Sequence, residues 1–376
     1  MAHKRWRLLA ILVLAFALVA AACGDDDDTA TTTAAPSDGG ETTETTAAPS
    51  DGEAMKVAFV HVGPVADKGW SWAHDQGAEY LKANMNVEVT TLESIPEGSD
   101  SQRVFEELAA DGNELIFGTS FGYMDPMLAA AENYPDVVFM HATGFKTSEN
   151  MGNYFGAAEE GRYLSGMAAG ASTETDLIGY VAAFPIPEVL RGINAFTLGV
   201  QEVNPDAQVQ VVWTSTWFDP PKEGTAAQSL LDAGADVIAM HQDSAAPGQA
   251  AEAAGAKWSG YNTDMTEFAP NAWLTAPIWD WGPYYLATAQ QVADGSWTAE
   301  AHYGNMADGM VNIAPFGTSV SEDTQALIKE REAEIKDLTF QVFPDPIIDQ
   351  DGNEIPLGDI FAMDYFVLGV IGSPTG

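Results

Sequence analysis

The feature that most limits how this 376-residue chain can fold is a regular alternation of strand and helix patterns from about residue 55 onward. Short apolar runs predict strands at residues 56–62, 87–91, 114–117, 137–140, 177–182, 207–213, 236–239 and 257–260. Segments with apolar residues at helical spacing lie between them, at residues 69–84, 101–110, 126–133, 161–172, 188–203, 222–232 and 248–254. Such alternation predicts an α/β fold with parallel sheets covered by helices on both faces.

The two halves of this pattern resemble each other. A helix, a glycine turn and a strand at residues 101–117 recur at residues 222–239, an offset of about 122 residues. We therefore expect two similar, doubly wound lobes. The first would hold residues 55–156 and about 277–310, and the second residues 157–276 and part of 311–376.

The N-terminus has the pattern of an export signal. Basic residues up to Arg7 precede residues 8–22, which carry no charge and are rich in Leu, Ala and Val. This apolar run is too short for a spanning helix, so residues 1–22 are predicted to be a signal peptide. The only cysteine, Cys23, follows three alanines. The site resembles a bacterial lipobox, although Ala20 stands where leucine is usual, and Cys23 is the predicted lipidation site. Cleavage that leaves an unmodified cysteine is the alternative.

Residues 24–53 are mostly Asp, Thr, Ala, Pro, Ser and Gly, and we expect residues 23–54 to form a disordered tether. The whole chain has 55 acidic and 15 basic residues, a formal charge of −40. This charge argues against nucleic acid as a partner, because nucleic-acid sites need basic patches.

Seven candidate loops at strand ends are rich in aromatic and acidic residues: 63–72, 118–125, 141–145, 214–219, 241–246, 261–265 and 276–281. Ligands of open α/β sheets bind beyond the carboxyl ends of the strands, so these loops are the candidate binding site. Aromatic faces with a few carboxylates and imidazoles favour a flat heteroaromatic solute. Eight residues are predicted to contact it: Trp70, Phe121, Tyr123, His141, Trp217, Asp243, Asp264 and Trp279.

Seven segments carry a family resemblance, in the family's order. They are residues 62–70 (VGPVADKGW), 118–126 (GTSFGYMDP), 141–144 (HATG), 217–220 (WFDP), 262–265 (NTDM), 281–285 (WGPYY) and 367–372 (VLGVIG). Together they resemble the basic membrane protein type of ABC-transporter substrate-binding lipoproteins. The resemblance implies a type I periplasmic-binding-protein fold, with two lobes joined by three crossing strands and a ligand in the cleft. It also implies a monomer on the outer face of the cell membrane, with an ABC permease and ATPase as partners.

Family members of known preference take purine nucleosides or related heterocycles, and the chain departs from the nucleoside-type pattern at two positions. His141 stands in place of an aspartate, and Trp279 stands near the place of a lysine associated with the ribose. The resemblance therefore favours a purine nucleobase such as adenine, with a nucleoside as the alternative. Trp70 and Trp217 are expected to stack on the base, and Asp243 and Asp264 to accept hydrogen bonds from it.

A serine hydrolase is the main competing function, because Ser120 lies in a G-x-S-x-G sequence after a strand. Three observations count against it. The next helix is predicted to begin only at Pro126, no oxyanion segment precedes Ser120, and the family resemblance explains the same residues without catalysis. We therefore predict a binding protein, without enzymatic activity.

No cofactor or metal site is predicted. A calcium loop around Gly352 fails, because Ile347 and Gly358 would occupy its ligand positions, and a hairpin turn at residues 351–352 is expected instead. The six histidines show no zinc spacing. A sensory lipoprotein that transports nothing stays open as a third class, because this fold also serves receptors.

Overall fold

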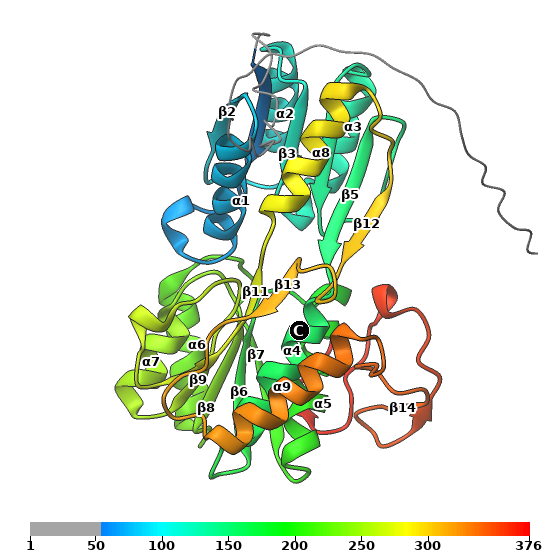
Figure 1. Cartoon of the computed structure of the whole chain (residues 1–376). Coiled ribbons are helices and arrows are strands. Elements are labelled where there is room, and N and C mark those ends of the chain that lie inside the picture. The colour runs from blue at the N-terminus through cyan, green and yellow to red at the C-terminus, as the bar shows by residue number, and fades with distance from the viewer. Residues whose placement is uncertain (1–53) are drawn as a thin grey trace, which may run out of the picture. The chain divides into compact units, whose positions relative to one another are not determined.

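The computed structural model describes residues 54–376 (Figure 1). The predicted signal peptide, Cys23 and nearly all of the predicted tether lie outside the described residues. Within them, two six-stranded sheets contain only parallel strand pairs. The α/β prediction is confirmed.

The first sheet has the strand order β12-β5-β4-β3-β1-β2. Its strands are β1 (Met55–Val60), β2 (Val87–Leu92), β3 (Leu115–Gly118), β4 (Val138–Ala142), β5 (Met151–Gly156) and β12 (Ala301–Gly304). The helices packed on it are α1 (Trp70–Asn84), α2 (Ser99–Ala110), α3 (Met124–Asn133) and α8 (Gly282–Asp294). Helices α1 and α8 lie side by side, and α2 packs against α3 (Figure 1). Two apolar clusters result, one under each pair.

The second sheet has the order β10-β9-β8-β6-β7-β16. Its strands are β6 (Leu177–Ala182), β7 (Gln208–Trp213), β8 (Val237–His241), β9 (Lys257–Ser259), β10 (Trp273–Thr275) and β16 (Val370–Ile371). Its helices are α4 (Ala158–Gly170), α5 (Pro187–Val203), α6 (Pro220–Asp232), α7 (Ala246–Ala254) and α9 (Glu322–Lys336). The order β7-β6-β8-β9-β10 repeats the order β2-β1-β3-β4-β5 of the first sheet. The weak sequence repeat therefore falls on equivalent elements.

The chain passes between the two sheets three times. It leaves the first sheet after β5, returns through β11 (Pro277–Trp279) and α8, and leaves again from β12 through β13 (Val311–Ile313). Strands β11 and β13 pair antiparallel and lie between the sheets (Figure 1). We call the first sheet with its helices the N-terminal lobe, and the second the C-terminal lobe.

Several local predictions differ from the structure, those for β5 and α3 among them. Strand β5 is missing from the predicted strands because Gly152, Asn153 and Gly156 have low strand propensity, yet every residue of β5 is buried between neighbours. Tertiary packing requires the small residues: a Cβ at Gly156 would lie 2.6 Å from the ring of Trp279, and one at Gly152 would lie a tight 3.0 Å from the carbonyl oxygen of Glu300. Helix α3 begins at Met124 rather than Pro126, directly after a 3₁₀ turn at Phe121–Tyr123.

The C-terminal segment completes the second lobe. Ser321 is the N-cap of α9, and its hydroxyl accepts a hydrogen bond from the amide of Thr324 at 3.1 Å. Strands β14 (Ile347–Ile348) and β15 (Glu354–Ile355) then form an antiparallel hairpin, and Gly352 in its turn has φ 83°. The predicted hairpin is confirmed. A 3₁₀ turn at Ile360–Ala362 packs against α5.

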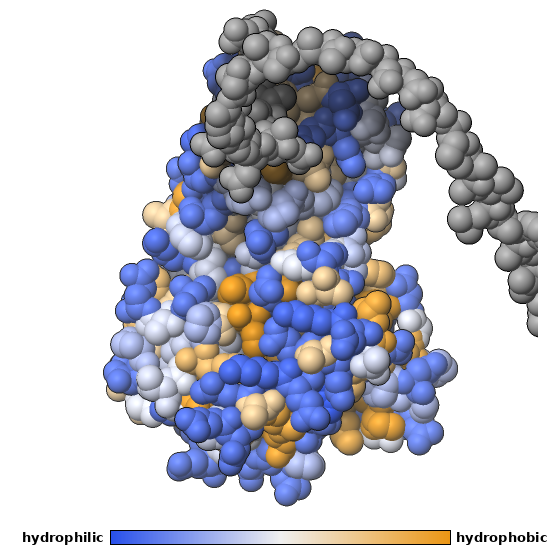
Figure 2. Space-filling model, viewed as in Figure 1, coloured by the Kyte–Doolittle hydropathy of each residue, from blue (hydrophilic) through white to orange (hydrophobic). Residues whose placement is uncertain are grey.

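The face of the molecule drawn in Figure 2 is mostly hydrophilic, with apolar residues in separate patches. Among the helices of residues 54–376, none is both long enough and apolar enough to span a bilayer.

Helices α4 and α5 approach each other through glycines. A Cβ at Gly199 would overlap the carbonyl oxygen of Tyr163, and one at Gly166 would overlap that of Phe196. In contrast, a Cβ at Gly224, within α6, would meet only the Cβ of Ala246 at 3.7 Å.

Replacing Gly199 with alanine is therefore expected to destabilise the protein by about 1–3 kcal/mol, because backbone must move to admit the methyl group. The matched change Gly224→Ala should leave stability unchanged or raise it by up to about 1 kcal/mol, because alanine favours a helix interior. Urea unfolding of the two variants measures both. Equal effects of the two changes would contradict the close packing of α4 on α5.

Candidate functional site

A cavity lies where the carboxyl ends of the strands of both lobes meet. Each residue that lines it ends a strand or lies in the segment after one, as the sheet topology requires. The N-terminal lobe contributes Val62, Trp70, Ser120, Phe121 and Thr143, and the C-terminal lobe contributes Glu188, Trp217, His241, Asp243 and Tyr261.

A second, larger chamber adjoins this cavity and shares three of its wall residues, Phe121, Thr143 and Glu188. Its other walls come from the loop after β4, from β5 and β12, from α5 and from the 3₁₀ turn near the C-terminus. Those residues are Gly144, Phe145, Asn153, Phe155, Pro187, Arg191, Ala301, His302, Tyr303, Asp359 and Phe361.

Two indole rings come to the cavity from opposite lobes. Trp70 is buried, and its Nε1 donates to the carbonyl oxygen of Thr119 at 2.6 Å, which fixes the ring. Trp217 is half-buried, and its Nε1 lies 3.3 Å from Oε1 of Glu97 in the N-terminal lobe. Phe121 adds a third ring. All three were predicted contacts, and the structure brings them together.

Asp243, a fourth predicted contact, lies where the two lobes touch. Its side chain is buried and accepts a hydrogen bond from Asn262 at 3.3 Å. The backbone before α1 packs directly on it, because a Cβ at Gly69 would overlap the carbonyl oxygen of Asp243. Next to this contact, the hydroxyl of Thr263 donates to the carbonyl oxygen of Lys68 across the lobes.

Tyr123 and His141 do not line either cavity. Tyr123 is packed in the core of the N-terminal lobe, where its hydroxyl donates to the carbonyl oxygen of Ile95 at 2.5 Å. The Nε2 of His141 lies 2.7 Å from the carbonyl oxygen of Ser120, behind the cavity wall. Burial lowers the pKa of His141 to about 4, so its imidazole is neutral and can donate there.

Asp264 and Trp279 also lie away from both cavities. The Asp264 carboxylate accepts from the amide of Thr266 at 3.0 Å and from its hydroxyl at 2.5 Å, which orders the following 3₁₀ turn. Trp279 stacks on Trp281, with ring centroids 4.7 Å apart, and its Nε1 donates to Asn262 at 2.9 Å. Its ring also packs nearly perpendicular to that of Trp70, with ring centroids 5.9 Å apart.

Six lining residues were not among the predicted contacts, and three of these belong to the C-terminal lobe: Glu188, His241 and Tyr261. Glu188 follows Pro187 at the start of α5, in the segment after β6. The predicted loops omitted that segment, although the rule that selected the others applies to it equally. His241 and Tyr261 lie in two of the candidate loops, residues 241–246 and 261–265.

Arg162 lies directly behind these three residues. It is buried, its Nη1 donates to the carbonyl oxygen of Met240 at 2.7 Å, and its guanidinium carbon lies 3.5 Å from the ring centroid of Tyr261. Around it, the part of the chain that the structure describes offers no hydrogen-bond partner for five buried polar atoms: Arg162 Nε and Nη2, His241 Nδ1, Glu188 Oε2 and the Tyr261 hydroxyl. Buried polar atoms are rarely left unpaired, so this group is suited to a polar ligand.

Burial shifts the protonation of the site. It raises the pKa of Glu188 to about 7, although the charges of Arg191 and Arg162 act in the opposite direction. It raises the pKa of Asp243 well above its usual range, and the nearby Asp67 carboxylate adds to that shift. Burial lowers the pKa of His241 well below its usual value, so its contact with Glu188 at 3.6 Å is not an ion pair at neutral pH.

The hydrolase alternative depends on Ser120. One argument against it was wrong, because a helical turn does begin right after this serine. The contacts of Ser120 nevertheless differ from those of a catalytic serine. Its hydroxyl donates to Glu97 at 2.6 Å, while His141 contacts its carbonyl oxygen and not the hydroxyl. Its backbone is extended, with φ −152° and ψ 146°, and lacks the strain of a nucleophile elbow.

Over residues 54–376, no group of three or more acidic, histidine or cysteine side chains is placed to hold a metal ion.

The raised carboxyl pKa values predict a pH dependence of stability. The folded pKa of Asp243 lies above its unfolded value, so its contribution is complete below about pH 4 and is lost as the pH rises through the folded pKa. Asp67 adds to this slope, because burial raises its pKa to about 6. In Asp243→Asn, Tm should therefore fall less between about pH 4 and pH 8 than in the unchanged protein.

Thermal melts across this range test the prediction. Asp206→Asn is the control, because it removes the same formal charge at an exposed position. An unchanged pH slope in Asp243→Asn would contradict the assignment.

The comparisons with known proteins agree with this geometry. Residues 54–339 match the Bmp family model, described as the PnrA-like ABC transporter substrate-binding protein. A purine-binding protein of Brucella abortus is 43% identical over 327 residues, covering 85% of this chain and 93% of the relative. A putative ABC transporter glucose-binding protein of Haloferax volcanii is 44% identical over 321 residues, covering 85% and 81%.

A solved structure agrees at the level of the fold. The solute-binding protein of an ABC transporter system from Conexibacter woesei has a TM-score of 0.63 at 23% identity, over 77% of this chain and 98% of its own. With a family model that covers most of the chain and two relatives above 40% identity, this chain belongs to the PnrA-like family of ABC-transporter substrate-binding proteins.

Proposed function

We propose that this protein captures a purine nucleobase, adenine or a close relative, in the cavity between its lobes and delivers it to an ABC permease. The observation that carries the proposal is the composition of the cavity: indole rings from both lobes and Phe121 surround a space that buried carboxyl groups also line. Stacking a base on one aromatic ring contributes about 1–3 kcal/mol. The carboxyl group of Asp243 can accept from ring N–H or amino groups through an oxygen that carries no proton.

The same arrangement supports lobe closure around the ligand. Trp217 contacts Glu97 across the cleft, so a ligand stacked on Trp217 would add to contacts that already join the lobes. A ligand that binds only when both lobes touch it shifts the population toward the closed form. A permease could then distinguish loaded from empty protein by the positions of the lobes.

Two relatives with similar identity carry different ligand names, purine for one and glucose for the other. The cavity favours the first, because five of its ten lining residues carry a ring: Trp70, Phe121, Trp217, His241 and Tyr261. Glucose is the second candidate, supported by the Haloferax relative. A nucleoside is the third, supported by the adjoining chamber, which offers space for a substituent on the base.

A calorimetric screen of adenine, adenosine, a pyrimidine, riboflavin and glucose against the purified protein tests the proposal. We expect adenine to bind with quenching of tryptophan fluorescence. Binding of glucose without any heterocycle would replace the proposal with its second candidate, and tighter binding of adenosine than of adenine would replace it with the third.

Trp217→Ala should weaken adenine binding at least about tenfold, since the loss of 1.4 kcal/mol is a factor of ten. Trp213→Ala is the control, because Trp213 lies outside the cavity and packs parallel to Phe366 at 6.4 Å. An affinity that Trp217→Ala leaves unchanged would remove Trp217 from the binding site. Esterase activity that is lost in Ser120→Ala would instead support the hydrolase alternative.

The proposal includes a lipid anchor at Cys23, which would hold a monomer near its permease at the outer face of the membrane. Mass spectrometry of the mature N-terminus should find Cys23 as the first residue, carrying acyl groups. Cys23→Ser should release the protein from the membrane. An unmodified Cys23 in membrane-bound protein would contradict the anchor and leave the ligand proposal unaffected.

A further inference from the structure

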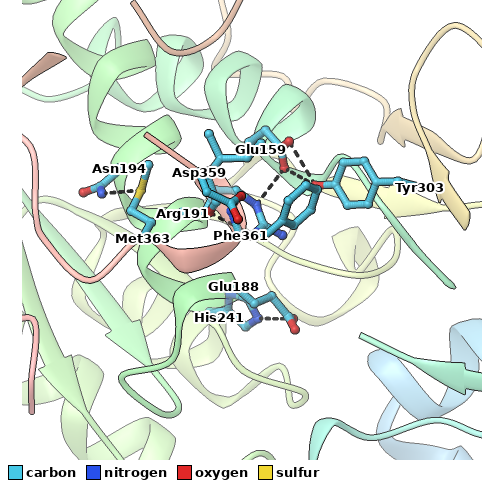
Figure 3. A network of polar contacts seen from close by, with 10 residues as sticks. Glu159, Glu188, Arg191, Asn194, His241, Tyr303, Asp359, Phe361 and Met363 are labelled. Carbon is cyan, nitrogen blue, oxygen red and sulfur yellow. Dashed lines mark hydrogen bonds and ion pairs between the residues drawn. The ribbon is translucent and has the colours of Figure 1, made fainter. Parts of the chain in front are cut away.

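Glu188 occupies a distinctive place in the cleft, because it lines both the cavity and the adjoining chamber. It stands in the first turn of α5, after Pro187, where the helix dipole favours a negative charge. Its Oε1 lies 3.6 Å from Nε2 of His241, as Figure 3 shows. Its Oε2 is buried, and no hydrogen-bond partner for it exists among residues 54–376.

The two cationic side chains whose charges act on Glu188 are Arg191 and Arg162, and both are engaged with other partners. Arg191 forms a buried ion pair with Glu159 at 3.2 Å, and Tyr303 donates to the same Glu159 carboxylate at 2.8 Å (Figure 3). Arg162 donates to the backbone of Met240. Their charges favour the ionised form of Glu188 without taking up its oxygens. Glu188 therefore keeps its capacity to accept hydrogen bonds.

A carboxylate only accepts hydrogen bonds, so a partner for Oε2 must be a donor. A buried acceptor left unpaired is costly, and the cost disappears when a ligand supplies an N–H group there. Stacking on Trp70 and Trp217 would recognise the faces of a flat ligand and tolerate many rings. The unpaired acceptor Glu188 Oε2 would instead distinguish ligands by the hydrogen-bond donors along the edge of the ring.

We propose that Glu188 determines specificity by accepting a hydrogen bond from an N–H donor of the ligand, so that the site selects purines with such a donor over purines without one. This inference rests on the proposed purine function and names the residue that reads the edge of the base. Adenine carries N–H groups at its amino substituent and in its ring. The matched ligand 9-methylpurine has a similar face and no hydrogen-bond donor.

The test compares the affinities of adenine and 9-methylpurine for the purified full chain and for two variants. The unchanged protein should bind adenine at least about tenfold more tightly than 9-methylpurine. A factor of this size is expected for a hydrogen bond to a charged group. Glu188→Gln should reduce that ratio at least about tenfold, mainly by weakening adenine. Glu330→Gln is the control, because Glu330 is exposed on α9 and lines neither the cavity nor the chamber, so the ratio should stay the same.

An adenine preference that Glu188→Gln leaves unchanged would overturn the inference. If neither purine binds the unchanged protein, the proposed function fails. If both purines bind equally well, only the role of Glu188 is overturned.

A measurement on the unchanged protein covers the case in which Glu188→Gln does not fold. The charged groups facing Glu188 are Arg162 from α4 and Arg191 from α5, with His241 neutral and with Asp243, Tyr261 and Tyr303 nearby. Because burial raises the pKa of Glu188 to about 7, the preference for adenine should increase as the pH rises through that value. A preference that is flat from about pH 5.5 to pH 8.5 would overturn the inference.

Discussion

The lobes meet where the backbone at Gly69 lies against the carbonyl oxygen of Asp243, a contact that leaves no space for a side chain. The properties of the site depend on this approach. It buries Asp243 and brings Asp67, at the start of α1, close enough to repel it electrostatically. With the lobes apart, water would reach these carboxyl groups and their pKa values would return toward the usual range. The electrostatics of the cavity are thus a property of the closed arrangement.

The sequence predicts the architecture well because the strands are buried on both faces and read as continuous apolar runs. The elements that escape prediction are those whose form is imposed by neighbours. Strand β5 contains glycines that tertiary packing requires, and β10, β11 and β13 are only three residues long each. For such segments, packing decides the structure and local propensity does not.

For the site, the rule that ligands bind beyond strand ends led to a region where the structure has a cavity, and four of the eight predicted residues line that cavity. Trp70, Phe121, Trp217 and Asp243 line the cavity, whereas Tyr123, His141, Asp264 and Trp279 support it from behind or lie apart. A loop position does not reveal whether a side chain points into the cleft or into the lobe. Tyr123 illustrates this. Phe121 lines the cavity, whereas Tyr123, only two residues later in the sequence, packs its ring on Phe105 in the core of the lobe. Glu188 was missed for a simpler reason, since its segment was not among the loops considered.

The cavity and its adjoining chamber share the wall formed by Phe121, Thr143 and Glu188, while most of their other residues differ. Substitutions at Phe145, His302 or Phe361 can reshape the chamber without touching the indole rings that would hold a base. A lineage with this architecture can therefore change the size of its ligand and the part it recognises in separate evolutionary steps. Relatives that share more than two fifths of their sequence with this chain and yet carry different ligand names are the outcome such a divided cleft allows.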